Sequence, residues 1–473
     1  MPLILSGNVA SATAGGYEVA NSCRFDDGSS AYMHKTPGGA GNQRKFTFST
    51  WFKLGNSTAN LTLFATGADG SNRFWIMRHN ESSNDSQIKI DAKTSDTQTI
   101  ELRTNASFRD PTAWIHLVVA VDTEQGTSTN RVKTYINGTQ ITSFNQTTYP
   151  DEDHDTEVNK AAEHRVGRYN AGDYYFDGYL AETVFIDGTQ YAASDFGEFD
   201  SDSPTIWKPK DVSGLTFGTN GFYLDYEASD NLGNDANGGT DLTESGIAAT
   251  DQTTDTPSLN YMTLNSIAGG VGDTARIPTF SEGNTKFTAA GSNTFYQAIS
   301  TFGVAVGKWY FEVKVASDQD LDKLRVGYWN IDKTVASGEI QDVSDANSHV
   351  FYMNKDGGEM RLNTTATTAD YGTFADDELM GVAIDMDAQT ITILKANSVI
   401  VNAYDYSGGI AAGTVLTPAF MGYDDTAFQV NFGNPHEANS SDAADENGYG
   451  AFEFAPPSGY LAYNSANLGS DGS

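Results

Sequence analysis

The stretch Lys45-Phe46-Thr47-Phe48-Ser49-Thr50-Trp51-Phe52-Lys53 decides the fold class of this chain. Large aromatic side chains alternate in it with small polar ones, which is the two-residue period of a half-buried β-strand. Similar short runs, rich in β-branched and aromatic residues, return at residues 74–77, 87–90, 114–121, 179–188, 309–315, 324–328, 379–387 and 390–395. The period of 3.6 residues that marks an amphipathic helix is nowhere sustained. We therefore predict an all-β protein.

The strongest local signal is a β-hairpin over residues 131–141. Asn137-Gly138 separates two runs of strand-forming residues in it. This dipeptide readily adopts the two positive φ angles of a type I′ turn, the turn that joins antiparallel strands most tightly. Antiparallel pairing is thus expected at least here, and short tight connections are expected elsewhere.

The strand runs form two blocks along a chain of 473 residues, which is too long for a single small core. We predict two antiparallel β-sandwiches joined by a loop-rich linker. The boundaries suggested by composition are an N-terminal arm at 1–21, a first sandwich at 22–205, a connecting segment at 206–256, a second sandwich at 257–468 and a C-terminal tail at 469–473.

Charge and hydropathy exclude two kinds of partner. The formal net charge is −34, from 62 acidic and 28 basic residues, and such a surplus repels the phosphate backbone of nucleic acids. No apolar run is long enough to span a bilayer, so we expect no membrane insertion. The acidic residues are scattered along the chain, which favours a role in solubility and salt tolerance.

Cysteine content and the N-terminal residues indicate where the protein is made. Cys23 is the single cysteine, so no disulfide can form within the chain. The start, Met1-Pro2-Leu3-Ile4-Leu5, lacks the basic region and the long apolar stretch of a signal peptide. We expect a protein made in a cytoplasm that reaches any extracellular position by another route.

One acidic stretch is a candidate metal site. Asp151, Asp153, Asp155 and Glu157 recur at every second residue. On an extended backbone their four carboxylates would point to one side, and Ca²⁺, which prefers oxygen ligands, would relieve their repulsion. The alternative is a solvated acidic loop, since the glycine of a typical calcium loop is missing. The pattern therefore predicts either a Ca²⁺ site or an acidic loop that binds no metal.

Two loops have the composition of a glycan site, with aromatic faces beside hydrogen-bonding groups. The first offers Tyr169, Asn170, Asp173, Tyr174 and Tyr175. The second offers Tyr352, Asn354, Lys355 and Asp356. The alternative in both cases is a β-turn whose tyrosines pack on the edge of a sandwich.

Catalytic motifs are absent from the sequence. Glucanases on a lectin-like fold need two glutamates flanking an aspartate on one strand, and Glu198-Phe199-Asp200-Ser201-Asp202 lacks the second glutamate. The seven histidines show no zinc spacing, and His116 within an apolar strand is expected to be a hydrogen-bonded core residue. We therefore expect no enzymatic activity.

The first block resembles a laminin-G-like domain of the concanavalin A-like lectin/glucanase group. The resemblance rests on the strand at 46–53, the strand at 114–122, the turn at 135–138, and the pairs Val166-Gly167 and Asp187-Gly188. It implies a concanavalin A-like jelly roll for this block.

The second block resembles a SPRY domain. The residues that carry the resemblance are Gly307-Lys308-Trp309-Tyr310-Phe311-Glu312-Val313, Gly327-Tyr328, the run 380–387 and Asn431-Phe432-Gly433. It implies a SPRY-like sandwich after the jelly roll, and both folds are used widely for recognition.

The order of motifs along the chain is similar to that in structural and tail-fibre-like proteins of tailed bacteriophages. The matching stretches are Arg24-Phe25-Asp26-Asp27 with Ala31-Tyr32, residues 42–51, the junction 257–265 and Pro457-Ser458-Gly459-Tyr460. This resemblance implies a virion protein, on the tail or the head, made in the host cytoplasm.

The expected function is therefore adhesion through protein or glycan contacts, with other virion proteins and a host-surface glycan or receptor as partners. Because isolated sandwiches leave strand edges that need cover, we also expect a homo-oligomer. The alternatives are a purely architectural protein that decorates a capsid or joins a fibre, and, less favoured, a polysaccharide-cleaving enzyme.

Overall fold

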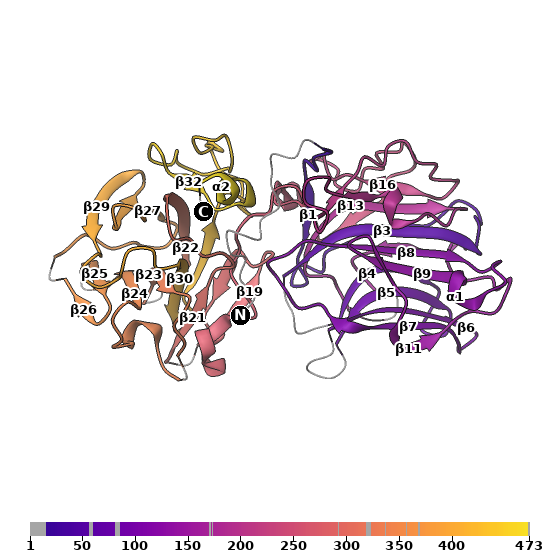
Figure 1. The fold of residues 1–473 in the computed structure, drawn as a ribbon, viewed down its shortest axis with the longest axis horizontal. Coiled ribbons are helices and arrows are strands. Elements are labelled where there is room, and N and C mark those ends of the chain that lie inside the picture. Colours follow the sequence, from indigo (N-terminus) through magenta and orange to yellow (C-terminus); the bar gives the residue numbers. More distant parts are fainter. Residues whose placement is uncertain are drawn as a thin grey trace. The chain divides into compact units, whose positions relative to one another are not determined.

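The computed structural model describes residues 16–55, 60–80, 86–169, 172, 174–291, 293–317, 323–335, 337–355, 357–367 and 369–471. The chain divides between Ser258 and Leu259 into two compact units, and each is built from antiparallel β-sheets (Figure 1). The predicted all-β class and the two sandwiches are confirmed. Within the described residues the α-helices are α1 (Ser128–Arg131) and α2 (Ser465–Asp471), and no helix there is long and apolar enough to cross a membrane.

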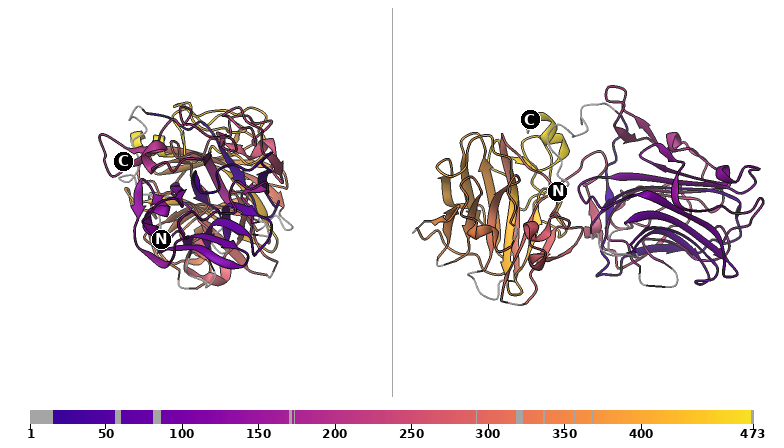
Figure 2. Two further views of the ribbon diagram at one scale, coloured as in Figure 1. Left: turned by 90° about the vertical axis from the view of Figure 1, so that its right-hand side faces the viewer. Right: turned by 60° about the horizontal axis from the view of Figure 1, so that its bottom comes forward.

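The first sandwich has two large sheets, whose strands are layered face to face (Figure 2). One sheet has the order β10-β9-β8-β3-β13-β1-β18, with β16 beside β13. Its strands are β1 (Ser22–Phe25), β3 (Lys45–Leu54), β8 (Ile115–Asp122), β9 (Val132–Ile136), β10 (Thr139–Ile141), β13 (Gly178–Asp187), β16 (Phe222–Leu224) and β18 (Gln252–Thr253).

The other sheet of this unit has the order β11-β7-β6-β5-β4-β12-β2-β17. Its strands are β2 (Tyr32–Lys35), β4 (Leu61–Gly67), β5 (Arg73–His79), β6 (Gln87–Thr94), β7 (Thr97–Ser107), β11 (Phe144–Thr148), β12 (His164–Val166) and β17 (Thr243–Ser245). β14 (Gly197–Phe199) and β15 (Trp207–Pro209) form a separate two-stranded sheet, and the short 3₁₀ helices are η2 (Ala193–Asp195) and η3 (Ala249–Asp251).

The strand β3 shows how the alternating pattern builds the core. Phe46, Phe48 and Phe52 point into the space between the sheets and join one apolar cluster. Trp51 and Lys53 point to the opposite face, yet they are buried too. The prediction of a half-buried strand is therefore wrong for β3, because later parts of the chain cover its second face.

Residues 206–256, expected as a connecting segment, instead complete the first sandwich. β16 pairs with β13, β17 pairs with β2 and β18 pairs with β1. Each of these strands has only two or three residues, which is too short for a period to be visible in the sequence. The carboxylate of Asp235 holds one of the turns, since its Oδ1 accepts the backbone N–H groups of Tyr223 and Asn237.

A buried ion pair fastens the end of this segment. Lys53 Nζ lies 2.7 Å from Asp255 Oδ2, and Trp114 Nε1 donates to Asp255 Oδ1 at 3.0 Å. Burial lowers the pKa of Lys53, and the charge of Asp255 acts in the opposite direction. The N-terminal arm predicted at 1–21 is described from residue 16 on, where the buried Val19 donates its N–H to Ser258 Oγ at 3.0 Å.

The second sandwich has one sheet in the order β19-β20-β31-β22-β27-β28-β29, with β32 parallel to β22, and another in the order β21-β30-β23-β24-β25-β26. The strands of the first sheet are β19 (Thr279–Ser281), β20 (Lys286–Thr288), β22 (Lys308–Ser317), β27 (Leu379–Asp385), β28 (Thr390–Lys395), β29 (Ser398–Asp405), β31 (Ala427–Asn431) and β32 (Leu461–Ala462). Those of the second are β21 (Phe295–Ile299), β23 (Arg325–Asn330), β24 (His349–Met353), β25 (Glu359–Leu362), β26 (Thr365–Ala366) and β30 (Leu416–Tyr423).

The core of this unit again follows from alternation. Trp309, Phe311 and Val313 of β22 enter the main apolar cluster, while Tyr310 and Glu312 lie on the opposite face. The 3₁₀ helices of the unit are η4 (Gly269–Gly272), η5 (Thr274–Arg276) and η6 (Ile340–Asp342). Residues 469–471, expected in a C-terminal tail, belong to α2.

Candidate functional site

The acidic stretch 151–157 does not form the predicted ligand set. Its backbone turns at Asp153, where φ is 59°, so the carboxylates are not arrayed along an extended segment. Arg44 binds Asp153 and Asp155 with N–O distances of 3.1 and 2.6 Å. The buried Glu157 pairs with Lys160 at 2.8 Å. An arginine of the chain itself takes the place that a metal was expected to have, and its hydrogen bond lowers the pKa of Asp155.

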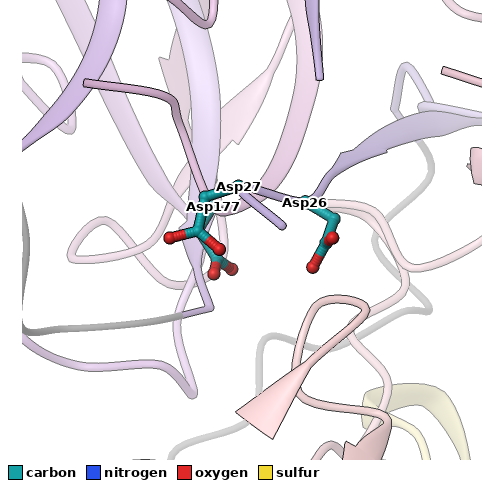
Figure 3. A group of neighbouring side chains, drawn as sticks. All are labelled: Asp26, Asp27 and Asp177. Carbon is teal, nitrogen blue, oxygen red and sulfur yellow. The ribbon is translucent and has the colours of Figure 1, made fainter. Parts of the chain in front are cut away.

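A different group of three carboxylates converges at one end of the first sandwich (Figure 3). Asp26 and Asp27 directly follow β1, and Asp177 directly precedes β13. Because β1 and β13 are antiparallel and pair Phe25 with Gly178, these strand ends must meet. One oxygen from each carboxylate lies within 4.8 Å of the other two. Among the described residues, this is the group of acidic side chains with metal-ligand spacing.

The surroundings of this carboxylate cluster fix its geometry. Asp26 and Asp177 are buried and Asp27 is exposed. The backbone N–H of Ser29 donates to Asp26 Oδ2 at 2.9 Å. A Cβ at Gly55 would lie 2.2 Å from Asp177 Oδ1, so only glycine leaves room for that carboxylate. The cluster is held by strand register and by a glycine rather than by a flexible loop.

Burial and a neighbouring carboxylate together shape the electrostatics of the cluster. Burial and the charge of Asp26 raise the pKa of Asp27, and its hydrogen bond with Asp177 lowers it in part. A bound divalent cation would favour all three charged forms. Ca²⁺ takes six to eight oxygen ligands, so one oxygen from each of the three carboxylates would supply part of the set and water the rest. Mg²⁺ demands stricter octahedral geometry.

The residues predicted to bind glycan separate into two groups. Trp75 of β5 stacks on Tyr169 with a centroid distance of 4.0 Å, and Tyr174 lies 5.5 Å from Trp75. Trp75 and Tyr169 are 6% and 5% exposed, whereas Tyr174 is 41% exposed. The first two rings therefore cover each other, and Tyr174 presents the open aromatic surface.

The remaining members of that prediction are placed differently. Tyr175 packs with Tyr32, and the Arg168 guanidinium lies over both rings, at 5.2 and 4.9 Å from their centroids. Asn170 and Asp173 lie outside the described residues. Tyr169 and Tyr175 therefore pack on the edge of the sandwich, as in the alternative interpretation. Tyr174 remains a candidate contact for a sugar ring.

Two family models match the chain where the two sandwiches lie. Residues 27–193 match a laminin-G type model of the concanavalin A-like lectin/glucanases superfamily, and residues 308–435 match the SPRY domain. The chain combines a laminin-G-like domain with a SPRY domain. The predicted resemblance to these two families is confirmed, and the three residues of the carboxylate cluster lie within or directly beside the first match.

Several solved structures are similar to parts of this chain at low identity and low TM-score. The SPRY domain of human HERC1 is 18% identical, with a TM-score of 0.26 over 31% of this chain and 87% of that chain. Domains LG4-5 of the mouse laminin alpha1 chain are 7% identical, with a TM-score of 0.30 over 88% and 90%. A pentraxin of Limulus polyphemus is 9% identical, with a TM-score of 0.28 over 37% and 80%. Scores this low carry no argument on function. A comparison with curated proteins gives no significant match.

His116 of the laminin-G-like domain is a core residue, as predicted. Trp207 Nε1 donates to His116 Nδ1 at 3.0 Å, so Nε2 carries the proton and donates to Ser49 Oγ, 2.9 Å away. Burial lowers the pKa of His116 to about 3. A histidine with both nitrogens engaged in this way cannot act as a general base for a substrate.

The carboxylates nearest to a glucanase motif are also engaged. Glu198 and Asp200 lie 3.6 and 3.4 Å from Lys208 Nζ across the β14–β15 pair. Asp200 Oδ1 in addition accepts the N–H groups of Asp202 and Ser203, which lower its pKa. These groups stabilise a surface turn.

In the SPRY domain the predicted glycan loop is largely structural. Tyr352 donates its hydroxyl to the carbonyl of Gly372. Asn354 donates to the carbonyl of Phe374 at 2.8 Å and accepts the Phe374 N–H at 2.7 Å. Both side chains are buried and fasten residues 372–374 to the sheet. Asp356 lies outside the described residues, and Lys355 lines a cavity together with Arg325 and Arg361.

A buried glutamate of this domain also holds a distant segment of the chain against the sheet. Glu312 of β22 accepts the backbone N–H groups of Glu453 and Phe454, both at 2.9 Å, and hydrogen bonds from Tyr310 and Asn431. All of these donors are neutral. Burial raises the pKa of Glu312 to about 7, although the four hydrogen bonds act in the opposite direction.

Proposed function

We propose that this protein is a non-catalytic adhesion protein whose two domains bind protein or glycan partners, with the laminin-G-like domain assisted by Ca²⁺. The observation that supports it most is the convergence of Asp26, Asp27 and Asp177 at the junction of β1 and β13 in a recognition fold. A cation there would neutralise the cluster and leave coordination positions toward solvent on the exposed Asp27 side.

The alternative to a metal at this cluster is a shared proton. The hydrogen bond between Asp27 and Asp177 and the raised pKa of Asp27 are compatible with that arrangement at low pH. The two alternatives separate by pH, since a shared proton leaves as pH rises whereas Ca²⁺ binding strengthens. At neutral pH and above we therefore expect the metal form wherever Ca²⁺ is present.

Adhesion is tested by glycan-array binding of the full chain with CaCl₂ and with EDTA. We expect glycan binding in CaCl₂ that is lost in EDTA and in Asp27→Asn/Asp177→Asn. The matched control is Asp153→Asn/Asp155→Asn, which removes the same charge from the Arg44-paired stretch and should bind as the wild type does. Release of reducing sugar from a bound polysaccharide would overturn the non-catalytic part of the proposal.

We further propose that the chain acts on a virus particle. Support comes from the order of the sequence motifs at 24–32, 42–51, 257–265 and 457–460, which is similar to that of phage structural proteins. Labelled-antibody microscopy of purified particles tests this. Label on tail or head is expected, and its absence from particles that carry the intact chain would contradict it.

A purely architectural role is the second candidate. The edge strand β29 exposes Val399, which is 53% exposed, next to backbone groups that can pair with another chain. Val399→Lys should then weaken a homo-oligomer, as read by sedimentation velocity, without affecting glycan binding. If the variant and the wild type sediment alike, β29 is not the subunit contact.

A further inference from the structure

A second cavity of the SPRY domain lies on the outer face of the sheet that contains β22 and β31. It has a volume of about 400 Å³. Its floor is formed by Glu312 and Lys314 of β22 and by Gln429 and Asn431 of β31. These four residues share one face of the sheet, because Glu312 pairs with Asn431 and Lys314 pairs with Gln429. That face is opposite to the core, which the neighbouring Val313 enters.

The walls of this cavity, called the acidic cavity below, combine apolar and charged residues. Leu379, Pro435 and Phe454 supply apolar surface. The acidic residues of the lining are Glu312, Asp377, Glu378, Glu437 and Glu453, and its basic residues are Lys314, Lys395 and His436. Even with the histidine counted as charged, the carboxyl groups outnumber the basic groups.

Two ion pairs engage both lysines of the acidic cavity. Lys314 Nζ lies 2.8 Å from Glu437 Oε2, and Lys395 Nζ lies 2.6 Å from Glu378 Oε2. All four side chains are partly exposed, so water weakens these pairs. Each lysine therefore balances one carboxylate, and the other acidic residues of the lining remain.

Two of those remaining carboxylates surround an ammonium group that is already paired. The hydrogen bond with Glu437 raises the pKa of Lys314, and the charges of Glu437, Asp377 and Glu453 add to this effect. Hydrogen bonds from the hydroxyl and the backbone N–H of Ser440 lower the pKa of Glu453. Within the described part of the chain neither Asp377 nor Glu453 forms an ion pair. One ammonium group thus faces three carboxylates.

The rest of the chain does not offer the missing cations. The positions outside the described ranges contain no lysine, arginine or histidine. Any acidic residue among them can only add to the negative charge. The acidic surplus of the cavity therefore does not depend on those positions.

The floor adds a buried carboxyl group that also has no counter-ion. Glu312 is 1% exposed, and the groups that donate to it are the neutral ones described above. Burial raises the pKa of Glu312 to about 7, and no cation contributes to its pKa. Buried carboxylates are ordinarily paired with a cation. A carboxyl group of this kind at the floor of a cavity points to a cation supplied from outside the chain.

The geometry favours an organic cation over a metal ion. Among the described residues, the carboxylates with metal-ligand spacing are those of Asp26, Asp27 and Asp177, so the carboxylates of the acidic cavity do not converge on one point. A cation on an apolar stem matches this lining better, because arginine and lysine bury their methylene groups against apolar surface and keep the charged end beside polar groups.

We propose that the acidic cavity binds an arginine side chain of a partner protein. Its volume is in the range of small-molecule sites. A guanidinium group presents five donors in a planar fork that fits carboxylates, and it stacks on aromatic faces such as that of Phe454. The choice of a protein partner rests on the proposed function; the choice of a cation rests on the cavity alone.

The test is isothermal titration calorimetry of the full chain with three probes in low salt. The first is a pentapeptide with one arginine between glycines, acetylated and amidated so that the arginine carries its only charge. The second has citrulline, the neutral counterpart, in place of the arginine. The third is glucosamine, whose ammonium group lies directly on a sugar ring.

We expect binding of the arginine peptide and at least tenfold weaker binding of the other two probes. Equal binding of the citrulline peptide would overturn the role of the cation. Preference for glucosamine would overturn the protein partner, and no binding of the arginine peptide would end the proposal.

Variants assign the binding to the cavity. Asp377→Asn/Glu453→Gln, which keeps the size of both side chains, should weaken binding of the arginine peptide at least tenfold. The matched control is Asp342→Asn/Asp345→Asn, which removes the same charge at positions that are 62% and 67% exposed and lie outside the lining. This control should bind like the wild type. Equal losses in both double variants would show attraction by net charge alone and would overturn the proposal.

A further variant places a cation of the chain itself in the cavity. Gln429 Nε2 donates to Glu437 Oε1 at 2.5 Å, so a lysine at this position would reach the same carboxylate. We expect Gln429→Lys to abolish binding of the arginine peptide, with thermal melting showing that the variant is folded. Binding by the folded variant that equals that of the wild type would contradict occupation of the cavity.

The outcomes separate this inference from the proposed function. Ca²⁺-dependent glycan binding without binding of the arginine peptide would leave adhesion by the laminin-G-like domain standing and end the inference on the acidic cavity. Binding of the arginine peptide that survives EDTA and Asp27→Asn/Asp177→Asn, with no Ca²⁺-dependent glycan binding, would do the reverse.

Discussion

The two domains place their charged groups in opposite ways. In the laminin-G-like domain the carboxylates of Asp26, Asp27 and Asp177 converge, and the buried cation Lys53 is sealed in an ion pair with Asp255. In the SPRY domain the basic residues Arg325, Lys355 and Arg361 line a cavity. The buried carboxylate of Glu312 accepts hydrogen bonds from neutral donors only. A net charge of −34 therefore says little about which sign any one site presents.

This difference predicts that a divalent cation is a ligand of the laminin-G-like domain and not of the SPRY domain. It also predicts that the two domains respond differently to loss of a buried charge and to pH. The experiments below address these differences in order of expected effect. Hydrogen exchange with mass spectrometry assigns each effect to a domain.

The largest effect is expected for Asp255→Ala. The substitution leaves the buried ammonium of Lys53 without its ion-pair partner and Trp114 Nε1 without its acceptor. Breaking one side of a buried pair costs about 3–5 kcal/mol. The free energy of unfolding of the laminin-G-like domain, from denaturant titration, should fall by that amount. Asp230→Ala, at an exposed position, is the control, and an equal loss in both variants would contradict the role of the pair.

The next effect is a pH dependence in the SPRY domain. The pKa of Glu312 is raised from 4.5 to about 7, so the folded state keeps a proton that the unfolded state has lost between these values. Its contribution to stability is present below about pH 4.5 and is lost as pH rises through about 7. The expected loss is about 3 kcal/mol over that interval.

His349 acts with the opposite sign in the same interval, because burial lowers its pKa to about 4. The quantity to measure is therefore the difference in unfolding free energy between the wild type and Glu312→Gln, which share His349. This difference should fall as pH rises from about 4.5 to 7 and then stay constant. A difference that does not vary with pH would mean that Glu312 ionises normally.

Ca²⁺ should stabilise the laminin-G-like domain and leave the SPRY domain unchanged. At a hundredfold excess over Kd the gain is about 2.7 kcal/mol. Asp27→Asn/Asp177→Asn should abolish the gain in thermal melting, whereas Asp153→Asn/Asp155→Asn should keep it. The opposite result would return the metal site to the acidic stretch at 151–157.

The smallest effect is expected at Tyr174, whose ring lies 5.5 Å from that of Trp75. Tyr174→Ala removes an aromatic contact at an exposed position, so the stability loss should be about 1 kcal/mol or less. If Tyr174 meets a sugar ring, glycan binding by the laminin-G-like domain should fall by more than this loss of stability can explain. Unchanged glycan binding would assign Tyr174 to packing alone.

The fold was predictable wherever strands are long enough to show a period. The alternation at 45–53 and the Asn137-Gly138 turn correspond to β3 and to the β9–β10 hairpin, in which Asn137 and Gly138 both have positive φ. β17 and β18 were missed because strands of two or three residues carry no period. They form through tertiary pairing and turns such as that at Asp235.

The candidate site was less predictable, since its parts meet only through register. Asp26-Asp27 is visible in the sequence, but Asp177 joins it because Phe25 pairs with Gly178. The stretch at 151–157 was predicted as a metal site from its spacing, but Arg44, far away in sequence, pairs with two of its carboxylates. Spacing along a chain reveals a site only when one element supplies all of its ligands.

The most direct test of the carboxylate cluster as a metal site is hydrogen exchange of the full chain with CaCl₂ and with EDTA. We predict that Ca²⁺ protects the amides around residues 26–29 and 177–178 and leaves the SPRY domain unchanged. Protection of the SPRY domain by Ca²⁺, or of neither domain, would contradict a metal site at Asp26, Asp27 and Asp177.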